Sequence, residues 1–250
     1  MTCWAVRRKN KMSIIYGHRG ASAYAPENTL EAFRLSLEMG ADGFELDVHL
    51  SADGELVVIH DESVDRTTNG TGLVRELTLA QLKALDASYG MTAYAGAKIP
   101  TLEEVFALVQ NTRHIVNVEI KTDEWFYAEI EEKCLALAKE KGVEDRVIYS
   151  SFNHYTLMKL RKLKPDAKLG MLFGDIMVSP WEYAKQLDVD YLHPMKMNIY
   201  VPGSAEQTLK AGYGINMWTI NDEETMGECM KYGAGIITNY PDIAVALKNK

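Results

Sequence analysis

Cysteine is scarce in this sequence, which contains only Cys3, Cys134 and Cys229. The three are far apart, odd in number and in no Cys-x-x-Cys arrangement. Such a set does not build a framework of paired disulfides, and it fits a reducing compartment. We therefore expect a cytoplasmic protein.

Long apolar runs are missing as well. No stretch approaches the ~18 residues that a bilayer-spanning helix requires, so we expect no stable membrane insertion. Residues 1–11 include several basic side chains with no long apolar segment after them, which makes a poor signal peptide. We expect residues 1–12 to be a disordered extension, or Met12 to be the real start of the chain.

Positive charge is in the minority, with 27 Lys and Arg against 35 Asp and Glu and a formal net charge of −8 at pH 7. The basic residues form no clustered stripe, so we expect no nucleic-acid partner. A small anionic substrate remains compatible with this balance, because a few local cations can outweigh the net charge.

Length and periodicity indicate the fold. With 250 residues, 47% of them hydrophobic, the chain suits a single α/β barrel, here over residues 13–250. Eight strand-like stretches alternate with helical patterns, which predicts parallel strands, right-handed crossovers and a (β/α)8 TIM barrel. The expected strands are 14–17, 43–48, 115–120, 147–151, 169–173, 190–193, 215–220 and 235–238. The expected helices are 29–39, 102–110, 125–141, 155–164, 180–187, 205–210, 223–232 and 243–248.

The segment after the second predicted strand departs from this repeat. Two strand patterns flank a turn centred on Ala52 and Asp53, too short for a parallel crossover, so they predict a β-hairpin. This centre sets Glu45 opposite His60, with Cβ atoms ~5 Å apart, although a bulge or longer loop would shift the register. Residues 62–100 then form an insertion over the barrel mouth.

Four short fragments carry the chemistry. Each closes an apolar stretch where a strand is expected to end, and the carboxyl ends of barrel strands form the active-site face. Together they supply imidazoles, carboxylates and cations, the groups needed for metal-assisted cleavage of a phosphate ester. The fragments are Gly17-His18-Arg19-Gly20, Glu45-Leu46-Asp47, His60-Asp61 and Glu119-Ile120-Lys121.

Strand alternation gathers the acidic side chains. Glu45 and Asp47 share one face of their strand, and Glu119 lies on the inward face of the next barrel strand. Burying several carboxylates together is unfavourable unless a cation neutralises them. An all-oxygen set suits Mg²⁺ or Ca²⁺ better than Zn²⁺. The sequence therefore predicts a divalent cation, Mg²⁺ or Ca²⁺, at these three residues.

The order of six fragments resembles the glycerophosphodiester phosphodiesterase family, from about Ile14 to Pro241. The fragments are His18-Arg19-Gly20, Pro26-Glu27-Asn28-Thr29, Glu45-Leu46-Asp47-Val48, His60-Asp61, Glu119-Ile120-Lys121 and Trp218-Thr219-Ile220-Asn221. No single fragment is decisive, but their order and spacing are specific together. The resemblance implies a TIM barrel that uses a divalent cation to hydrolyse small-molecule glycerophosphodiesters to sn-glycerol 3-phosphate and an alcohol.

The resemblance also implies roles for individual residues. His18 and His60 would be the acid-base pair, while Arg19 and Lys121 would hold phosphate oxygens. The metal ligands would be the three carboxylates already described. Our hypothesis is that His18 deprotonates the nucleophile, either water or a hydroxyl of the substrate, and that His60 protonates the departing alkoxide.

Neighbouring residues have competing interpretations. Trp218 packs either in the core or, as the family match favours, as a wall against the glycerol moiety, and Phe152 is a second candidate for that wall. His49 imitates the Asp-x-His of dinuclear metallophosphoesterases but lacks a companion His-rich motif, so we expect it to be structural or exposed. Glu27 and Asn28 either contact the site or belong to the start of the next helix.

Two alternative functions stay open. A barrel phosphodiesterase of the lysophospholipase D or phosphatidylinositol phospholipase C kind would use a similar His pair on a lipid and expose an apolar rim. A non-catalytic barrel would be a binding module, which the retained histidines and acidic residues disfavour. The apolar stretch around Met195 and Met197 is compatible with a lip of the site or with a homo-oligomer contact.

Overall fold

A ring of parallel strands forms the centre of the molecule. The computed structural model describes residues 12–250, so the prediction for residues 1–12 lies, apart from Met12, outside the described residues. Within that range eight strands pair in a closed ring, with β1 joined to both β9 and β2. The ring confirms the predicted (β/α)8 TIM barrel. Its strands are β1 (Ile15–His18), β2 (Gly43–Leu50), β4 (Ile115–Ile120), β5 (Val147–Ser151), β6 (Lys168–Phe173), β7 (Tyr191–Pro194), β8 (Gly214–Met217) and β9 (Gly235–Thr238).

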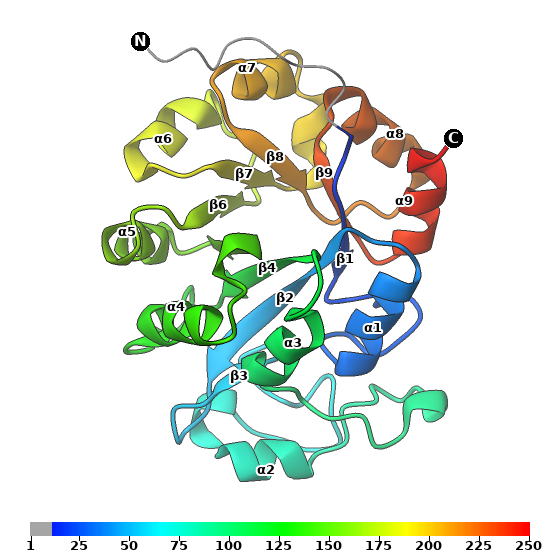
Figure 1. Ribbon diagram of the computed structural model, residues 1–250, viewed down its shortest axis with the longest axis vertical. Helices are drawn as coiled ribbons and strands as arrows, with labels where there is room; N and C mark the ends of the chain where they lie inside the picture. Colours follow the sequence, from blue (N-terminus) through cyan, green and yellow to red (C-terminus); the bar gives the residue numbers. More distant parts are fainter. Residues whose placement is uncertain (1–11) are drawn as a thin grey trace.

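Helices surround this ring on the outside (Figure 1). Side chains of Thr29, Thr101 and Asp222 accept backbone N–H bonds at the starts of three of them, which fixes where those helices begin. The barrel helices are α1 (Leu30–Glu38), α3 (Leu102–Val109), α4 (Ile130–Glu140), α5 (His154–Leu163), α6 (Pro180–Leu187), α7 (Ser204–Lys210), α8 (Glu223–Tyr232) and α9 (Pro241–Lys248). Short 3₁₀ helices are η3 (Glu144–Arg146) and η4 (Lys196–Tyr200). Over residues 12–250, none of the helices combines the length and apolar character needed to cross a membrane.

Barrel strands separate apolar from polar side chains by simple alternation. Leu46 and Val48 of β2 are buried in one hydrophobic cluster with Val118 of β4 and with Leu102 and Phe106 of α3. Their neighbours along each strand point to the opposite side, into the barrel. The outward residues thus pack against the helices, and the inward positions of these two strands can hold polar side chains.

The hairpin after β2 is present, but its predicted register was wrong by one residue. β3 (Leu56–Val58) pairs antiparallel with β2 outside the ring, and Val48 lies opposite Val58. The loop has an extra residue because Gly54 adopts a left-handed φ of +80°, as in three-residue hairpin loops. Ile59, rather than Val58, therefore lies opposite Asp47, to whose carbonyl its N–H donates a 3.1 Å bond, and His60 does not lie opposite Glu45 as predicted.

Two element boundaries also differ from the sequence prediction. The helix predicted over 125–141 begins only at Ile130, because its first residues make tertiary contacts instead. The guanidinium carbon of Arg75 lies 3.7 Å from the centre of the Trp125 ring, and the Tyr127 hydroxyl is hydrogen-bonded to His49. The strand predicted over 215–220 ends at Met217.

Residues 62–100 lie beside the barrel at the bottom of Figure 1. They include η1 (Val74–Glu76), α2 (Leu79–Ala84) and η2 (Thr92–Tyr94). Val74 and Leu82 pack with Val57 and Ile59 of the hairpin in a cluster of their own. This small core fixes the insertion to the strand that leads into it.

His193 is a buried histidine on β7. It alternates with Leu192, which packs in the outer cluster, and its Nε2 lies 2.9 Å from the Asn216 amide nitrogen. Burial lowers the pKa of His193 to about 3. The folded chain therefore keeps this ring neutral at pH values where the unfolded chain protonates it.

This burial predicts a stability that depends on pH. The stabilisation that neutral His193 adds to the free energy of unfolding is fully present above the ordinary histidine pKa of about 6.5. It is lost as pH falls toward 3. In His193→Gln, the free energy of unfolding should therefore fall less steeply with decreasing pH, by up to ~1.4 kcal/mol per pH unit between pH 4 and 6. Urea unfolding of both proteins across this range measures the difference. Parallel pH profiles would refute the prediction.

Candidate active site

His18 closes β1 at the mouth of the barrel. Its Cα pairs with that of Glu45 on β2, and its Nδ1 lies 2.7 Å from the side-chain oxygen of Asn239. Because that oxygen only accepts, Nδ1 carries the proton and Nε2 is left as the basic nitrogen. Burial, followed by the charge of Arg19, lowers the pKa of His18 to about 4. A neutral imidazole of this kind is able to accept a proton at neutral pH.

The turn after β1 brings backbone and side-chain donors to the acidic residues. Arg19 has a left-handed φ of +54°, which few non-glycine residues adopt. In this conformation its backbone N–H donates to Glu45 Oε2 at 3.0 Å, and its Nη1 donates to Glu27 Oε1 at 2.8 Å. Its Nε is 3.5 Å from Asp47 Oδ2. The strained turn thus places the predicted phosphate-binding arginine against the acidic cluster.

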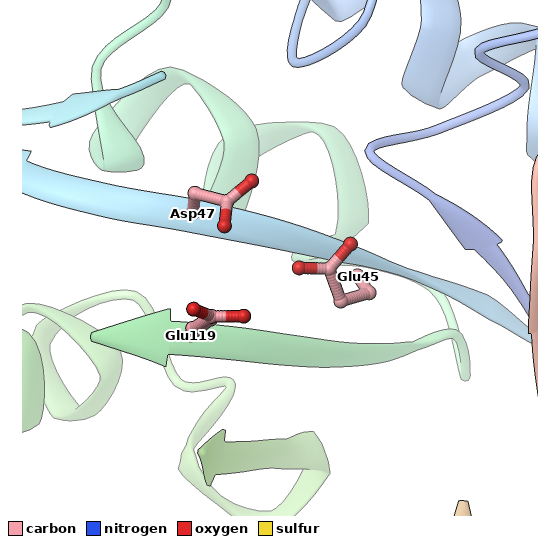
Figure 2. A group of neighbouring side chains, drawn as sticks. All are labelled: Glu45, Asp47 and Glu119. Carbon is pink, nitrogen blue, oxygen red and sulfur yellow. The ribbon is translucent and has the colours of Figure 1, made fainter. Parts of the chain in front are cut away.

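Glu45, Asp47 and Glu119 form that acidic cluster. Glu45 and Asp47 come from β2 and Glu119 from the adjacent β4, as Figure 2 shows. One carboxylate oxygen from each lies within 4.8 Å of the others, and all three residues are buried. The structure thus brings together the three residues that strand alternation selected.

The cluster is electrostatically unbalanced. Burial, with the charges of Asp47 and Glu119, raises the pKa of Glu45 well above its ordinary value. Burial also raises the pKa of Glu119, although Lys121 Nζ donates to it at 3.1 Å. For Asp47, burial opposes ionisation but the charges of Arg19 and His60 outweigh it, so its pKa is lowered. Additional positive charge at this position would relieve the repulsion.

One oxygen of Asp47 supports a cation site. Asp47 Oδ2 accepts a 2.8 Å bond from the Asn28 amide, whereas the buried Oδ1 has no hydrogen-bond partner among residues 12–250. A buried carboxylate oxygen without a donor, beside two further carboxylates, fits a hard divalent cation with oxygen ligands. Asn28 therefore contacts the site by orienting Asp47, one of the two alternatives for this residue.

Lys121 lies beside the cluster at the end of β4. It is buried, and the carboxylates of Glu119 and Asp47 raise its pKa although burial acts in the opposite direction. Lys121 therefore stays protonated, as a residue that holds phosphate oxygens must.

His60 lies just past β3 and is held at two points. Its Nδ1 is 2.6 Å from Asp61 Oδ1, and its backbone carbonyl is 3.1 Å from His49 Nε2. The other nitrogen of His49 is 3.1 Å from the Tyr127 hydroxyl. His49 is therefore buried and structural rather than exposed. The charge of His60 contributes to the pKa values of Asp47 and Glu119, so it lies within electrostatic reach of the cluster.

Arg66 was missed by the sequence analysis. This residue of the insertion donates to both Asp61 and Glu27, and Glu27 also accepts from Arg19. Glu27 thus contacts the site through two arginines. The family fragment Pro26-Glu27-Asn28-Thr29 signalled this residue, but no periodicity marks Arg66 as its partner.

Phe152 and Trp218, the two predicted wall residues, lie together. Their rings are 5.4 Å apart and meet edge to face at 89°. The Trp218 indole N–H donates to the His193 carbonyl at 2.8 Å, which fixes the orientation of the indole. The two rings are therefore in contact with each other, and their role as a wall against the glycerol moiety stays a prediction.

Known proteins resemble this chain over almost its whole length. Residues 18–243 match a family described as "Glycerophosphoryl diester phosphodiesterase family". A glycerophosphodiester phosphodiesterase of Caldanaerobacter subterraneus subsp. tengcongensis is 45% identical over 95% of this chain and 98% of its own length. A second, from Bacillus altitudinis, is 39% identical over 96% of this chain and 99% of its own length.

Solved structures agree in fold. A phosphodiesterase from Oleispira antarctica, determined in complex with the product sn-glycerol-3-phosphate, has a TM-score of 0.89 and 30% identity over 96% of this chain and 98% of its own. A glycerophosphodiester phosphodiesterase from Agrobacterium tumefaciens has a TM-score of 0.84 and 33% identity over 94% of this chain and 100% of its own.

Proposed function

This chain belongs to the glycerophosphoryl diester phosphodiesterase family, and we propose that it hydrolyses glycerophosphodiesters to sn-glycerol 3-phosphate and an alcohol by divalent-cation-assisted histidine acid-base catalysis. The family resemblance inferred from the six sequence fragments is confirmed by the match over residues 18–243. The relatives named as glycerophosphodiester phosphodiesterases support the reaction, and the product-bound relative supports a small-molecule substrate.

One observation carries the proposal for this chain: the buried acidic cluster has two histidines near it, one at the end of the neighbouring β1 and one just past β3. His18 pairs with Glu45 across β1 and β2, while His60 acts electrostatically on Asp47 and Glu119. The unpartnered Oδ1 of Asp47 supports a cation between these groups. Two imidazoles beside an oxygen-ligand site are the parts that phosphodiester cleavage requires.

In the proposed mechanism, Glu45, Asp47 and Glu119 would hold Mg²⁺ or Ca²⁺. When bound, the cation supplies positive charge that offsets the negative charge developing on the phosphoryl oxygens. Arg19 and Lys121 orient the phosphate through charge-assisted bonds. His18 Nε2 takes the proton of the attacking hydroxyl or water as its oxygen bonds to phosphorus. The bond from phosphorus to the alcohol oxygen breaks as His60 Nε2–H gives that oxygen a proton. With water as the nucleophile this step gives sn-glycerol 3-phosphate directly, whereas with the substrate hydroxyl it gives a cyclic phosphate that water then opens.

Release of glycerol 3-phosphate from glycerophosphocholine and glycerophosphoethanolamine tests the proposal. We expect release by the purified protein, its loss after chelation with EDTA, and its return with Mg²⁺ or Ca²⁺, because the carboxylates repel one another without a cation. Activity unaffected by exhaustive chelation would contradict metal dependence. Absence of release from both substrates with metal present would contradict the substrate class.

Exposed apolar side chains favour a second candidate substrate, a lysophospholipid. Phe126, in the loop after β4, is 79% exposed. Ile176 and Val178, in the loop after β6, are 60% and 95% exposed, and Met197, after β7, is 45% exposed. These positions follow the carboxyl ends of barrel strands, where the mouth lies, and they provide the apolar rim expected of a lipid-cleaving relative. Release of choline from lysophosphatidylcholine faster than from glycerophosphocholine would favour this candidate.

Two further features stay predictions from the sequence. A cytoplasmic location rests on the cysteine content, and Cys134 and Cys229 are free and buried. A homo-oligomer rests on the apolar stretch around Met195 and Met197, and size determination in solution would test it.

A further inference from the structure

We infer that Arg66 is a positioning residue for His60, because it clamps the Asp61 carboxylate that holds the His60 ring. This inference rests on the proposed function, in which His60 protonates the departing alkoxide. Arg66 belongs to the insertion beside the barrel, and no contact with substrate is required of it.

Arg66 is committed to two carboxylates of the protein. Its Nε and Nη2 donate to the two oxygens of Asp61 at 2.7 and 2.9 Å. Its Nη1 and Nη2 donate to the two oxygens of Glu27 at 2.9 and 2.8 Å. Paired bonds of this kind fix the plane of a carboxylate as well as its distance. The guanidinium is therefore built into a fixed network rather than available for a phosphate.

His60 needs such support because the sheet does not supply it. β3 ends at Val58, two residues earlier, and the His60 side chain is 31% exposed. His49 holds the backbone carbonyl, but only Asp61 bonds the ring among the contacts described. The Asp61 side chain is itself 28% exposed, so without Arg66 it would occupy several rotamers. An acid must lie within hydrogen-bond reach of the leaving oxygen to transfer its proton.

Glu27 anchors this arrangement to the barrel. It lies in the loop between β1 and α1 and shares its Oε1 between Arg66 and Arg19. The hydrogen bonds of Arg66 also hold the pKa of Asp61 well below its usual range, so Asp61 remains an acceptor. Arg66 thus connects the loop after β3 to the loop after β1.

Two substrates distinguish positioning of the acid from general stabilisation. The leaving group of glycerophosphoethanolamine is a poor one that needs a proton, whereas p-nitrophenolate in sn-glycerol 3-(p-nitrophenyl phosphate) leaves without one. For Arg66→Gln we expect kcat on glycerophosphoethanolamine to fall roughly 10- to 100-fold, a part of the full general-acid effect, and kcat on the nitrophenyl ester to fall less than about 3-fold. His60→Ala should show the same selectivity.

Arg75→Gln is the matched control. Arg75 lies in the same insertion with a side chain 34% exposed, against 36% for Arg66, and it packs over Trp125 rather than on Asp61. The kcat of this variant on each substrate should stay within about 2-fold of that of the unmodified protein. Arg66→Lys keeps the charge but cannot donate paired bonds to both carboxylates, so kcat should again fall more on glycerophosphoethanolamine than on the nitrophenyl ester. It serves as the second variant if Arg66→Gln does not fold.

Equal losses on both substrates, or no loss on either, would overturn the role of Arg66. Equal losses would indicate a general effect on stability or on Arg19 through Glu27. If the unmodified protein releases neither product with metal present, the proposed function fails instead, and the two failures are thereby distinguished.

Discussion

His18→Ala is expected to lower turnover of glycerophosphodiesters at least ~100-fold, the loss typical of an absent general base. The reason lies in its surroundings: Asn239 fixes the proton on Nδ1, and burial lowers the pKa of His18 to about 4, so Nε2 is free of a proton at neutral pH. Because the base activates the nucleophile, the ethanolamine and nitrophenyl substrates should lose turnover alike. This pattern contrasts with the selective loss expected for His60→Ala.

Steady-state kinetics of the two substrates, with metal at saturation, measure this prediction. His114→Ala is the control, because His114 precedes β4 at the end of the barrel opposite the strand ends that carry the site. Its turnover should stay within about 2-fold of the unmodified protein. Near-normal turnover of His18→Ala would remove this residue from the mechanism.

Glu45→Gln is expected to abolish activity and to stabilise the metal-free protein. Burial and two neighbouring carboxylates raise the pKa of Glu45 well above its ordinary value, so this charge is unfavourable without a cation. Each unit of pKa shift corresponds to about 1.4 kcal/mol, and the amide still accepts the Arg19 N–H bond. We expect the Tm in EDTA to rise by about 3–6 °C, and turnover to fall more than ~100-fold through loss of a ligand.

Thermal unfolding with and without Mg²⁺ or Ca²⁺ measures both effects. The unmodified protein should gain Tm with metal, whereas the Glu45→Gln variant should not. Glu131→Gln is the control, since Glu131 is a buried carboxylate of α4 whose charge is paired with Lys159 at 2.9 Å. That variant should have a lower Tm than the unmodified protein and the same activity. A similar loss of Tm in Glu45→Gln would show that the cluster is not under charge repulsion.

Most of the barrel was predictable because its signals are local. Buried strands such as Val147–Ser151 read as short apolar runs, and helices such as Glu223–Tyr232 have a clear start at an N-cap. The hairpin register was not, because it depends on one left-handed residue, Gly54, in the turn. The start of α4 was not predictable either, since contacts of Trp125 and Tyr127 with distant residues override helical periodicity.

The acidic cluster was predictable for a similar reason. Alternation along β2 and β4 puts Glu45, Asp47 and Glu119 inside the barrel whatever the loops do. Arg66 carries no such signal, because its position relative to Asp61 and Glu27 is set by an irregular segment with no period. Side chains on strands could thus be assigned from spacing, whereas side chains on loops required coordinates.

The placement of the hairpin outside the ring has an evolutionary consequence. β2 and β4 are hydrogen-bonded neighbours, so the chain leaves the ring and returns to it at adjacent positions, and closure does not depend on what lies between. The proposed acid His60 and its support Arg66 are both carried by residues 56–100, while the acidic cluster and His18 belong to the ring. We therefore expect that residues 56–100 can be exchanged between related barrels that keep the partners Glu27 and His49 of this segment, with the metal-binding carboxylates left in place.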